Sequence, residues 1–526
     1  MKRLGWSALV LAVALGTGAG SAAPPKGGAQ RPAAGPVTVT IVHLNDVYEI
    51  LPVEGGKSGG LARVATVVQR LKKSRAPVIT TLGGDYLSPS ALGTAIIDGQ
   101  PMAGRQMVDV LNAVGIDWAT FGNHEFDVSE AAFRAHLAQA RFRLVSANVT
   151  DAAGQPFPGV VTSAIVPVTV GAGKPASRAA AGRGKGGGAK AAGGGRTVRI
   201  GLVGVTIDSN PKPWVKYLDA IAAARAEVAK LAGKVDAIVA LTHLSLEQDA
   251  EFVAAVPGID LVLGGHEHEN WLMYRGRFVP VVKADANARS LAVVSMTFGR
   301  PGARPEIAAR LMPIDDTIAA EPAVDAVARG WVERGFEAFR RQGFAPEAVV
   351  ALATEPLDGR ESTVRNRPGR LTDLIAAAMA REAGTTTDVA LFNGGSIRID
   401  DLLPPGPITE YDIIRVMPFG GKVVKTAFDG ELLARVLDTG LNNEGIGGYL
   451  QTWGVRRESG GWLVQGRPIE PARRYTVALN DFLLTGLETN LGYLKRDHPQ
   501  VHDVVELRDI RRVVIDELSR VYPPRK

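Results

Sequence analysis

The sequence predicts a layered α/β fold (α+β in its details) with two domains joined by a helix. Its 526 residues exceed the size at which one hydrophobic core keeps growing, so at least two domains are expected. From residue 37 onward, short apolar runs alternate with amphipathic stretches, which is typical of strands alternating with helices. This alternation stops after Pro313, where a long helical pattern precedes a second α/β region.

Residues 1–23 have the pattern of a secretory signal peptide. Lys2 and Arg3 precede an apolar run over residues 4–15, and small residues follow up to Ala23. The run is too short for a membrane anchor, because a bilayer crossing needs about 20 apolar residues. The chain has no cysteine, which excludes lipidation at cysteine, disulfides and thiolate metal ligands. We therefore expect a periplasmic or secreted protein without a stable membrane anchor.

A domain is predicted over residues 37–315. Its clearest strand candidates are apolar runs bounded by polar residues, at 37–44, 78–82, 198–207, 236–241 and 259–263. Between two strand-like runs, residues 171–196 form a Gly/Ala/Lys tract with too little apolar content to fold, so we expect a disordered insertion. Binding of this tract to an anionic surface is the alternative to a solvated loop.

The net charge of +6 does not indicate a nucleic-acid groove. The tract 171–196 contains six basic residues and no acidic one, which accounts for the whole excess. The remaining sequence is close to neutral, so we expect no nucleic-acid polymer as a partner.

A helix is predicted over residues 321–341, within a linker spanning 316–346. A smaller α/β domain is expected over residues 347–522, and its last helix should end near Val521.

Five short polar segments in the first domain lie at or just after predicted strands. Side chains at strand ends converge on one edge of a sheet, and oxygen and imidazole donors suit Mn, Zn or Fe ions. Any one segment is weak support: His43 is better explained as a core histidine, and His266 and His268 could share a strand. Together they predict a metal centre. The segments are Asn45-Asp46, Gly83-Gly84-Asp85, Gly122-Asn123-His124-Glu125, Thr242-His243 and Gly264-Gly265-His266-Glu267-His268.

These segments resemble the calcineurin-like metallophosphoesterases, and among them the bacterial periplasmic 5′-nucleotidase and UDP-sugar hydrolase group. The resemblance spans about residues 37–520 and implies an N-terminal β-sandwich flanked by helices. It also implies two metal ions, both divalent or one of them trivalent. In that arrangement Asp85 bridges the two ions. Asp46 and His268 belong to the first ion, and Asn123, His243 and His266 belong to the second.

The resemblance implies a His124-Asp127 catalytic pair that stabilises charge on phosphoryl oxygens and helps the leaving group depart. The alternative for Asp127 is a residue at the start of the following helix. One departure concerns Tyr48, which stands where the family usually has histidine in Asp-x-His. A phenolate can bind ferric iron, and loss of one ligand is the other reading.

The second domain resembles the substrate-binding domain of the same family. The resemblance implies that Asn393 and Arg398 contact phosphate or ribose, that Arg365 contacts phosphate, and that Phe419 and Phe482 clamp a base. Arg367 is the alternative to Arg365, and core packing is the alternative for each phenylalanine alone. Glu488 stands where the family commonly has an aspartate that holds ribose hydroxyls.

The resulting expectation is an exported phosphoesterase that acts on a small nucleotide, with its oligomeric state open. Rival activities on the same scaffold are those of a 2′,3′-cyclic phosphodiesterase, a UDP-sugar hydrolase or a thiosulfate-type esterase. A rival of another class is an exported nucleotide-binding protein whose metal site has decayed at Tyr48.

Overall fold

The computed structural model describes residues 35–74, 76–170 and 196–524. The expected signal peptide and nearly all of the expected insertion lie outside the described residues. The last residue of that insertion, Arg196, is instead the first residue of a strand and pairs with Val170 of the strand before it. The strand extends to Arg196 because its antiparallel pairing with residues 163–170 continues to that point.

The N-terminal region (residues 37–315) contains two sheets. The first has the order β17-β16-β1-β2-β5-β6-β8, parallel from β1 to β8 and antiparallel at β16 and β17. Its strands are β1 (Val37–Leu44), β2 (Val78–Leu82), β5 (Trp118–Ala119), β6 (Arg143–Val145), β8 (Val160–Val161), β16 (Ser290–Phe298) and β17 (Glu306–Pro313).

The second sheet has the order β14-β15-β13-β12-β10-β9, and its four central strands run parallel. These strands are β9 (Ser163–Val170), β10 (Arg196–Thr206), β12 (Ala237–His243), β13 (Leu261–Gly264), β14 (Trp271–Arg275) and β15 (Val279–Lys283).

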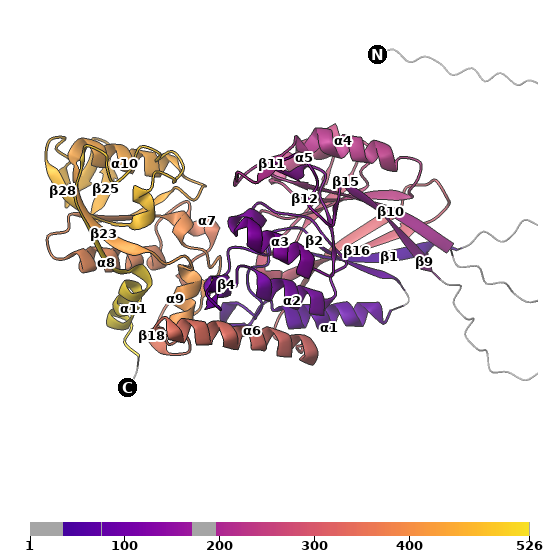
Figure 1. Cartoon of the computed structure of the whole chain (residues 1–526), viewed down its shortest axis with the longest axis horizontal. Coiled ribbons are helices and arrows are strands. Elements are labelled where there is room, and N and C mark those ends of the chain that lie inside the picture. The colour runs from indigo at the N-terminus through magenta and orange to yellow at the C-terminus, as the bar shows by residue number, and fades with distance from the viewer. Residues whose placement is uncertain (1–34, 75, 171–195, 525–526) are drawn as a thin grey trace, which may run out of the picture. The chain divides into compact units, whose positions relative to one another are not determined.

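The two sheets pack face to face, as the resemblance implied. Val39 and Ile41 of β1 share a buried cluster with Ile200 of β10 and Val239 of β12. On the outer faces, α1 (Leu61–Lys72), α2 (Arg105–Val114) and α3 (Glu130–Gln139) lie beside the first sheet, and α4 (Ala220–Leu231) and α5 (Leu246–Ala255) lie beside the second (Figure 1). The N-terminal region is therefore a β-sandwich between helices.

The linker helix α6 (Pro322–Arg341) contacts both regions of the chain. Its Trp331 indole donates a hydrogen bond to Asp109 of α2 (3.2 Å). Its Phe336 ring lies 4.7 Å, between centroids, from Tyr411 of α9 (Glu410–Val416).

The C-terminal region (residues 347–522) is built on a five-stranded sheet of order β24-β20-β28-β23-β29, in which β20 and β28 are parallel. Helices α8 and α11 pack on one face and α10 on the other. These elements are β20 (Val389–Asn393), β23 (Lys422–Asp429), β24 (Leu450–Trp453), β28 (Arg474–Asn480), β29 (Val501–Asp509), α8 (Arg370–Ala383), α10 (Gly430–Asn442) and α11 (Ile510–Val521).

The smaller elements are β3 (Ile96–Ile97), β4 (Gln100–Pro101), β7 (Val149–Asp151), β11 (Val215–Tyr217), β18 (Val349–Ala353), β19 (Leu357–Asp358), α7 (Glu361–Val364), β21 (Leu402–Leu403), β22 (Gly406–Thr409), β25 (Val455–Glu458), β26 (Gly461–Val464) and β27 (Arg467–Pro468). None of the helices formed by the described residues combines the length and the apolar character needed to cross a bilayer.

Candidate active site

The predicted metal ligands meet where parallel strands of both sheets end. Asp46 and Asp85 follow β1 and β2 of the first sheet, whereas His243 is the last residue of β12 in the second. The sequence predicted that all the ligands lie at the edge of one sheet. That placement was wrong, because the two sheets of the sandwich present their carboxyl ends side by side, and each supplies part of the set.

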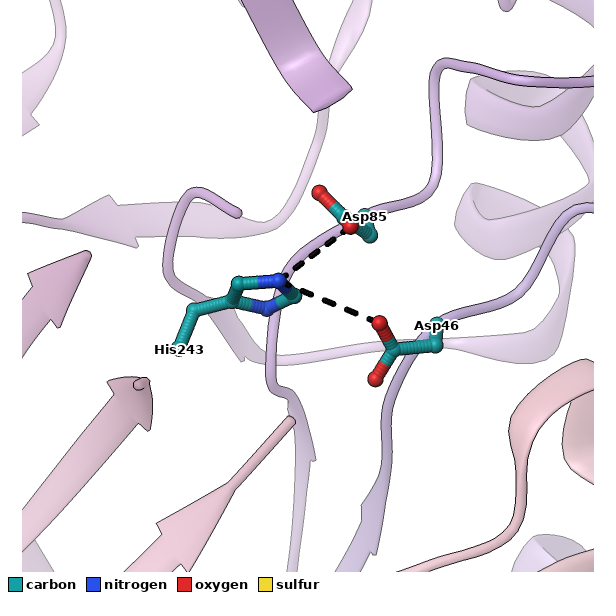
Figure 2. Close-up of side chains that lie close together, drawn as sticks. All are labelled: Asp46, Asp85 and His243. Carbon is teal, nitrogen blue, oxygen red and sulfur yellow. Dashed lines mark ion pairs between the residues drawn. The ribbon is translucent and has the colours of Figure 1, made fainter. Parts of the chain in front are cut away.

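Asp46, Asp85 and His243 form the centre of the cluster (Figure 2). Their side chains are at most 1 % exposed, and one potential ligand atom from each lies within 4.8 Å of the others. The His243 Nε2 atom is 3.2 Å from an Asp85 oxygen and 3.9 Å from an Asp46 oxygen. The Nδ1 atom donates to the Gly83 carbonyl (2.7 Å), which leaves Nε2 as the atom that faces the carboxylates.

These residues fit the divalent cations that the fold class implies. In the described part of the chain, the buried atoms His243 Nε2 and Asn123 Oδ1 have no hydrogen-bond partner, so each has a lone pair to offer. A Cβ on Gly122 would lie 2.1 Å from an Asp85 oxygen. Any other residue at position 122 would therefore clash with the Asp85 carboxylate. The donor set is oxygen and imidazole, which suits Mn, Zn or Fe.

His268 and Tyr48 complete one side of the cluster. His268 Nε2 lies 3.6 Å from an Asp46 oxygen and 2.9 Å from the Tyr48 hydroxyl. The same hydroxyl lies 3.3 Å from Asp85 and 3.4 Å from Asp46. Tyr48 therefore points into the ligand group.

His266 joins the group from the other side. Its backbone N–H donates to Asp46 (2.9 Å), and its ring centroid is 5.3 Å from that of His243. It follows the end of β13 at Gly264, so His266 and His268 lie in a loop and not on one strand.

Several of these residues have a left-handed backbone. The φ angles are 51° at Asp46, 55° at Asp85, 86° at His266 and 58° at His268. Such values are uncommon outside glycine, and strained backbone of this kind concentrates at functional sites. The left-handed residues bring side chains from the loops after β1, β2 and β13 into one cluster.

When no cation is present, charge in the cluster favours protonated His243 and His268, whereas burial and the neighbouring His243 lower the pKa of His266 to about 3. Burial alone would lower the pKa of His243, but the carboxylates of Asp85 and Asp46 outweigh burial and raise this pKa to about 9. Burial likewise opposes the charged form of His268, and Glu361 and Asp400 raise its pKa to about 10. Metal binding must displace these protons, so affinity should fall in acid.

Glu125 was not predicted from the sequence. Its buried carboxylate accepts hydrogen bonds from the backbone N–H groups of Asp85 (2.9 Å), Tyr86 (2.7 Å) and Gly122. Burial and the nearby Asp85 raise the pKa of Glu125 to about 7. Glu125 therefore fixes the two loops that carry Asp85 and Asn123. Its place directly after His124 in a ligand segment was the available signal.

His124 and Asp127 are paired, with 2.6 Å between Nδ1 and a carboxylate oxygen. The start of α3 is capped by Ser129, which accepts from the Ala132 N–H, so Asp127 is not the capping residue. Asn210 donates to Asp127 (3.1 Å) and to the Asn123 carbonyl (3.2 Å). Asn210 lies in an irregular segment after β10, and no motif in the sequence marks it.

A cleft of about 800 Å³ opens beside His124 and is lined by both regions of the chain. It is lined by Arg365 but not by Arg367, and Phe419 and Phe482 are 58 % and 38 % exposed, unlike core residues. The predicted residues that line it are Asn123, His124, Arg365, Asn393, Arg398, Phe419, Phe482 and Glu488.

Two arginines in the cleft have unused donors. Within the described residues, the Nε atoms of Arg365 and Arg398 are buried without a hydrogen-bond partner. Arg398 also lies over the Phe419 ring, 5.8 Å from its centroid. Both guanidinium groups can therefore donate to an anion in the cleft.

The amide of Asn393 is largely held by neighbours. It donates to Glu488 (2.6 Å) and accepts from Asn480 (3.0 Å). Asn480 was not among the predicted substrate contacts. Only one N–H of Asn393 is left for a ligand. Glu488 is buried and orients Asn393, so a direct contact between Glu488 and ribose is not needed to explain its position.

Two protein families match parts of this chain. Residues 39–270 match the calcineurin-like phosphoesterase family, and residues 349–493 match the 5′-nucleotidase C-terminal domain. A human 5′-nucleotidase is 26% identical over 473 residues, covering 81% of this chain and 76% of the relative. A Naja atra venom 5′-nucleotidase is 25% identical over 475 residues, covering 80% and 82%.

Solved structures share the fold. A 5′-nucleotidase precursor from Thermus thermophilus superposes with a TM-score of 0.70 at 23% identity, covering 92% of this chain and 97% of the other. The sulfate thiohydrolase SoxB of the same species superposes at 0.65 with 18% identity, covering 94% and 95%. At such identities the likeness concerns the fold.

Proposed function

This chain belongs to the family that joins a calcineurin-like phosphoesterase domain to a 5′-nucleotidase C-terminal domain, and from that premise we propose that it hydrolyses nucleoside 5′-monophosphates outside the cytoplasm. The coarser activity follows from the family, since its members are metal-dependent phosphoric ester hydrolases that act on nucleotides. The observation that carries the finer proposal is the 800 Å³ cleft. It joins His124 and Asn123 of the metal region to Arg365 and Arg398 and to two exposed phenylalanines.

The contacts support a division of labour between the two regions. Arg365 and Arg398 would bind phosphate oxygens, and Phe419 and Phe482 would stack on the base, since every base offers a π-face. Asn393, oriented by Glu488, would contribute its remaining N–H to phosphate or ribose. A nucleotide bound in this way would place its phosphate toward His124 and Asn123.

Asp46, Asp85, Asn123, His243, His266 and His268 would hold the two cations, and Tyr48 is included as a candidate ligand. When bound, the cations would activate water and neutralise charge on the phosphoryl oxygens. The Asp127 carboxylate orients the His124 ring through Nδ1. The opposite nitrogen would then stabilise phosphoryl charge and give a proton to the departing ribose oxygen.

Export remains part of the proposal. The charged and apolar pattern of residues 1–23 and the absence of cysteine support a periplasmic or secreted protein. We also propose a phosphoesterase domain over residues 37–315, a linker over 316–346 and a substrate-binding domain over 347–522.

A substrate panel on metal-stripped protein, with Mn²⁺, Zn²⁺ or Fe²⁺ restored singly, tests the function. We expect phosphate release from AMP to exceed hydrolysis of 2′,3′-cyclic AMP, a UDP-sugar and a thiosulfate ester. Preference for one of the last three would reassign the substrate within the same scaffold. Nucleotide binding without any hydrolysis would contradict the enzyme and favour a binding protein.

A further inference from the structure

His268 is held by a carboxylate from the other region of the chain. Its Nδ1 lies 2.9 Å from an oxygen of Asp400, a residue 132 positions later in the sequence. Its Nε2 faces Asp46 and Tyr48. A carboxylate accepts hydrogen bonds, so Nδ1 carries a hydrogen and Nε2 is the nitrogen that can offer a lone pair to a bound cation.

Asp400 is itself fixed in place. It is 6 % exposed, and its second oxygen accepts from the Glu361 N–H (2.9 Å). Its φ angle of 38° is left-handed, as at four of the proposed ligands. Asp400 is therefore a buried, fixed partner of His268 and not a mobile surface side chain.

A second contact ties the same loop to the metal region. The next residue, Asp401, pairs with Arg415 (2.9 Å), and Arg415 pairs with Glu49 (3.0 Å). Glu49 directly follows Tyr48, so the loop contacts the cluster at His268 and is linked through Arg415 of α9 to the segment that carries Asp46. The same loop carries Arg398, which lines the substrate cleft.

His243 provides the internal contrast. The Nδ1 atom of His243 is held by the Gly83 carbonyl, which comes from the same region and the same group of strand ends. His268 is therefore the histidine of the cluster whose outer hydrogen bond depends on the C-terminal region.

We propose that Asp400 is a positioning residue that completes the first metal subsite from the C-terminal region, by fixing the tautomer and orientation of His268. This inference rests on the metal centre of the proposed function, and it does not depend on which substrate the enzyme prefers. The Asp400–His268 hydrogen bond makes metal binding at the first subsite, and not at the second, depend on how the two regions are arranged.

Metal binding by the full-length, metal-stripped protein tests the proposal. Mn²⁺ would be titrated into the parent protein, Asp400→Asn and Asp400→Ala by calorimetry, with electron paramagnetic resonance to distinguish a coupled pair from a single ion. We expect one of the two ions to bind about 10–100-fold more weakly in Asp400→Ala, the usual effect of losing an outer partner of a metal ligand. The second ion should bind within about twofold of the parent. Asp400→Asn should fall between, because its amide oxygen still accepts from Nδ1.

The matched control is Asp373→Asn, which changes an exposed carboxylate in the first turn of α8 that lines neither this contact nor the cleft. It should bind both ions as the parent does. Circular dichroism should show that each metal-free variant is folded at the temperature of the titration. Equal weakening of both ions, or unchanged binding in Asp400→Ala, would overturn the proposal. The readout is independent of AMP turnover, so failure of the nucleotide assay would leave it interpretable.

Discussion

His243 and His268 face the same pair of carboxylates, yet their outer nitrogens are held in different ways. His243 donates to the backbone of Gly83 in its own region, whereas His268 donates to the Asp400 side chain of the other region. The first arrangement involves residues of the N-terminal sandwich alone. The second also requires the C-terminal region to be docked. The half of the centre around His243 is thus held by the N-terminal region alone. The half around His268 also depends on the loop of the C-terminal region that lines the substrate cleft.

Removing the carboxylate shared by both halves should have the largest effect. Asp85 lies 3.2 Å from His243 and 3.3 Å from the Tyr48 hydroxyl, so it borders both subsites. Asp85→Ala should abolish binding of both ions and lower kcat/KM at least about a thousandfold, since several kcal/mol of charge stabilisation are lost. Metal analysis together with AMP hydrolysis would check this. If Asp85→Ala retained either ion, Asp85 would not be a ligand shared by the His243 half and the His268 half of the centre.

Removing the acid beside the centre should leave both halves intact. His124→Ala should lower kcat about 10²–10⁴-fold, the usual contribution of a general acid, while metal content stays at the parent level. Asp127→Asn should have a smaller effect of the same kind, because the ring remains but loses its charged partner. The measurement is steady-state kinetics beside metal analysis. Turnover that survives His124→Ala would remove the pair from the mechanism.

The N-terminal sandwich can be tested through His43, which bonds to Thr81 of the first sheet and the Gly264 carbonyl of the second (both 3.0 Å). Burial lowers the pKa of His43 to about 4. The unfolded chain therefore takes up this proton first as the pH falls, so stability present above about 6.5 is lost toward pH 4, by about 3 kcal/mol. Urea unfolding across this range should show a loss about 3 kcal/mol larger in the parent than in His43→Gln, because His266 and His136, whose pKa values are also lowered, titrate in both proteins. Parallel curves for the two proteins would contradict the assignment.

The cleft should show the smallest effect. Phe419→Ala should raise KM for AMP about 5–150-fold, which corresponds to the 1–3 kcal/mol of one base–aromatic stack, with kcat nearly unchanged. Phe278→Ala is the matched control, because this phenylalanine is 85 % exposed and lies outside the cleft. Metal content should not change in either variant. A loss of kcat at constant KM would show that Phe419 does not act by stacking.

The parts of the site that the sequence predicted are those with local signals. Glycine-flanked acids and histidines at the ends of apolar runs indicated Asp46, Asp85, Asn123, His243, His266 and His268 as candidate ligands, and the structure brings the segments that carry them together. Periodicity likewise placed β1 and β2 correctly and found α6 to within one residue of its start. These signals are contained in a few consecutive residues.

The parts that were missed depend on contacts between distant segments. The meeting of two sheets at the site, the Asp400 contact with His268 and the Asn210 contact with Asp127 join residues 83 or more positions apart. The residues around Asn210 and Asp400 form no motif that distinguishes them from an ordinary loop sequence. Arg196 was misplaced because its composition belongs to the preceding tract, whereas its pairing is set by Val170 across the sheet.

The left-handed backbone at Asp46, Asp85, His266 and His268 limits which residues evolution or an engineer can place there. Aspartate, asparagine, histidine and glycine tolerate such angles, whereas β-branched side chains do not. A library meant to change the metal preference of this enzyme would therefore yield more folded members if it sampled this short alphabet at the four positions. Wider diversity belongs at Tyr48, which is absent from the left-handed residues among the described part of the chain.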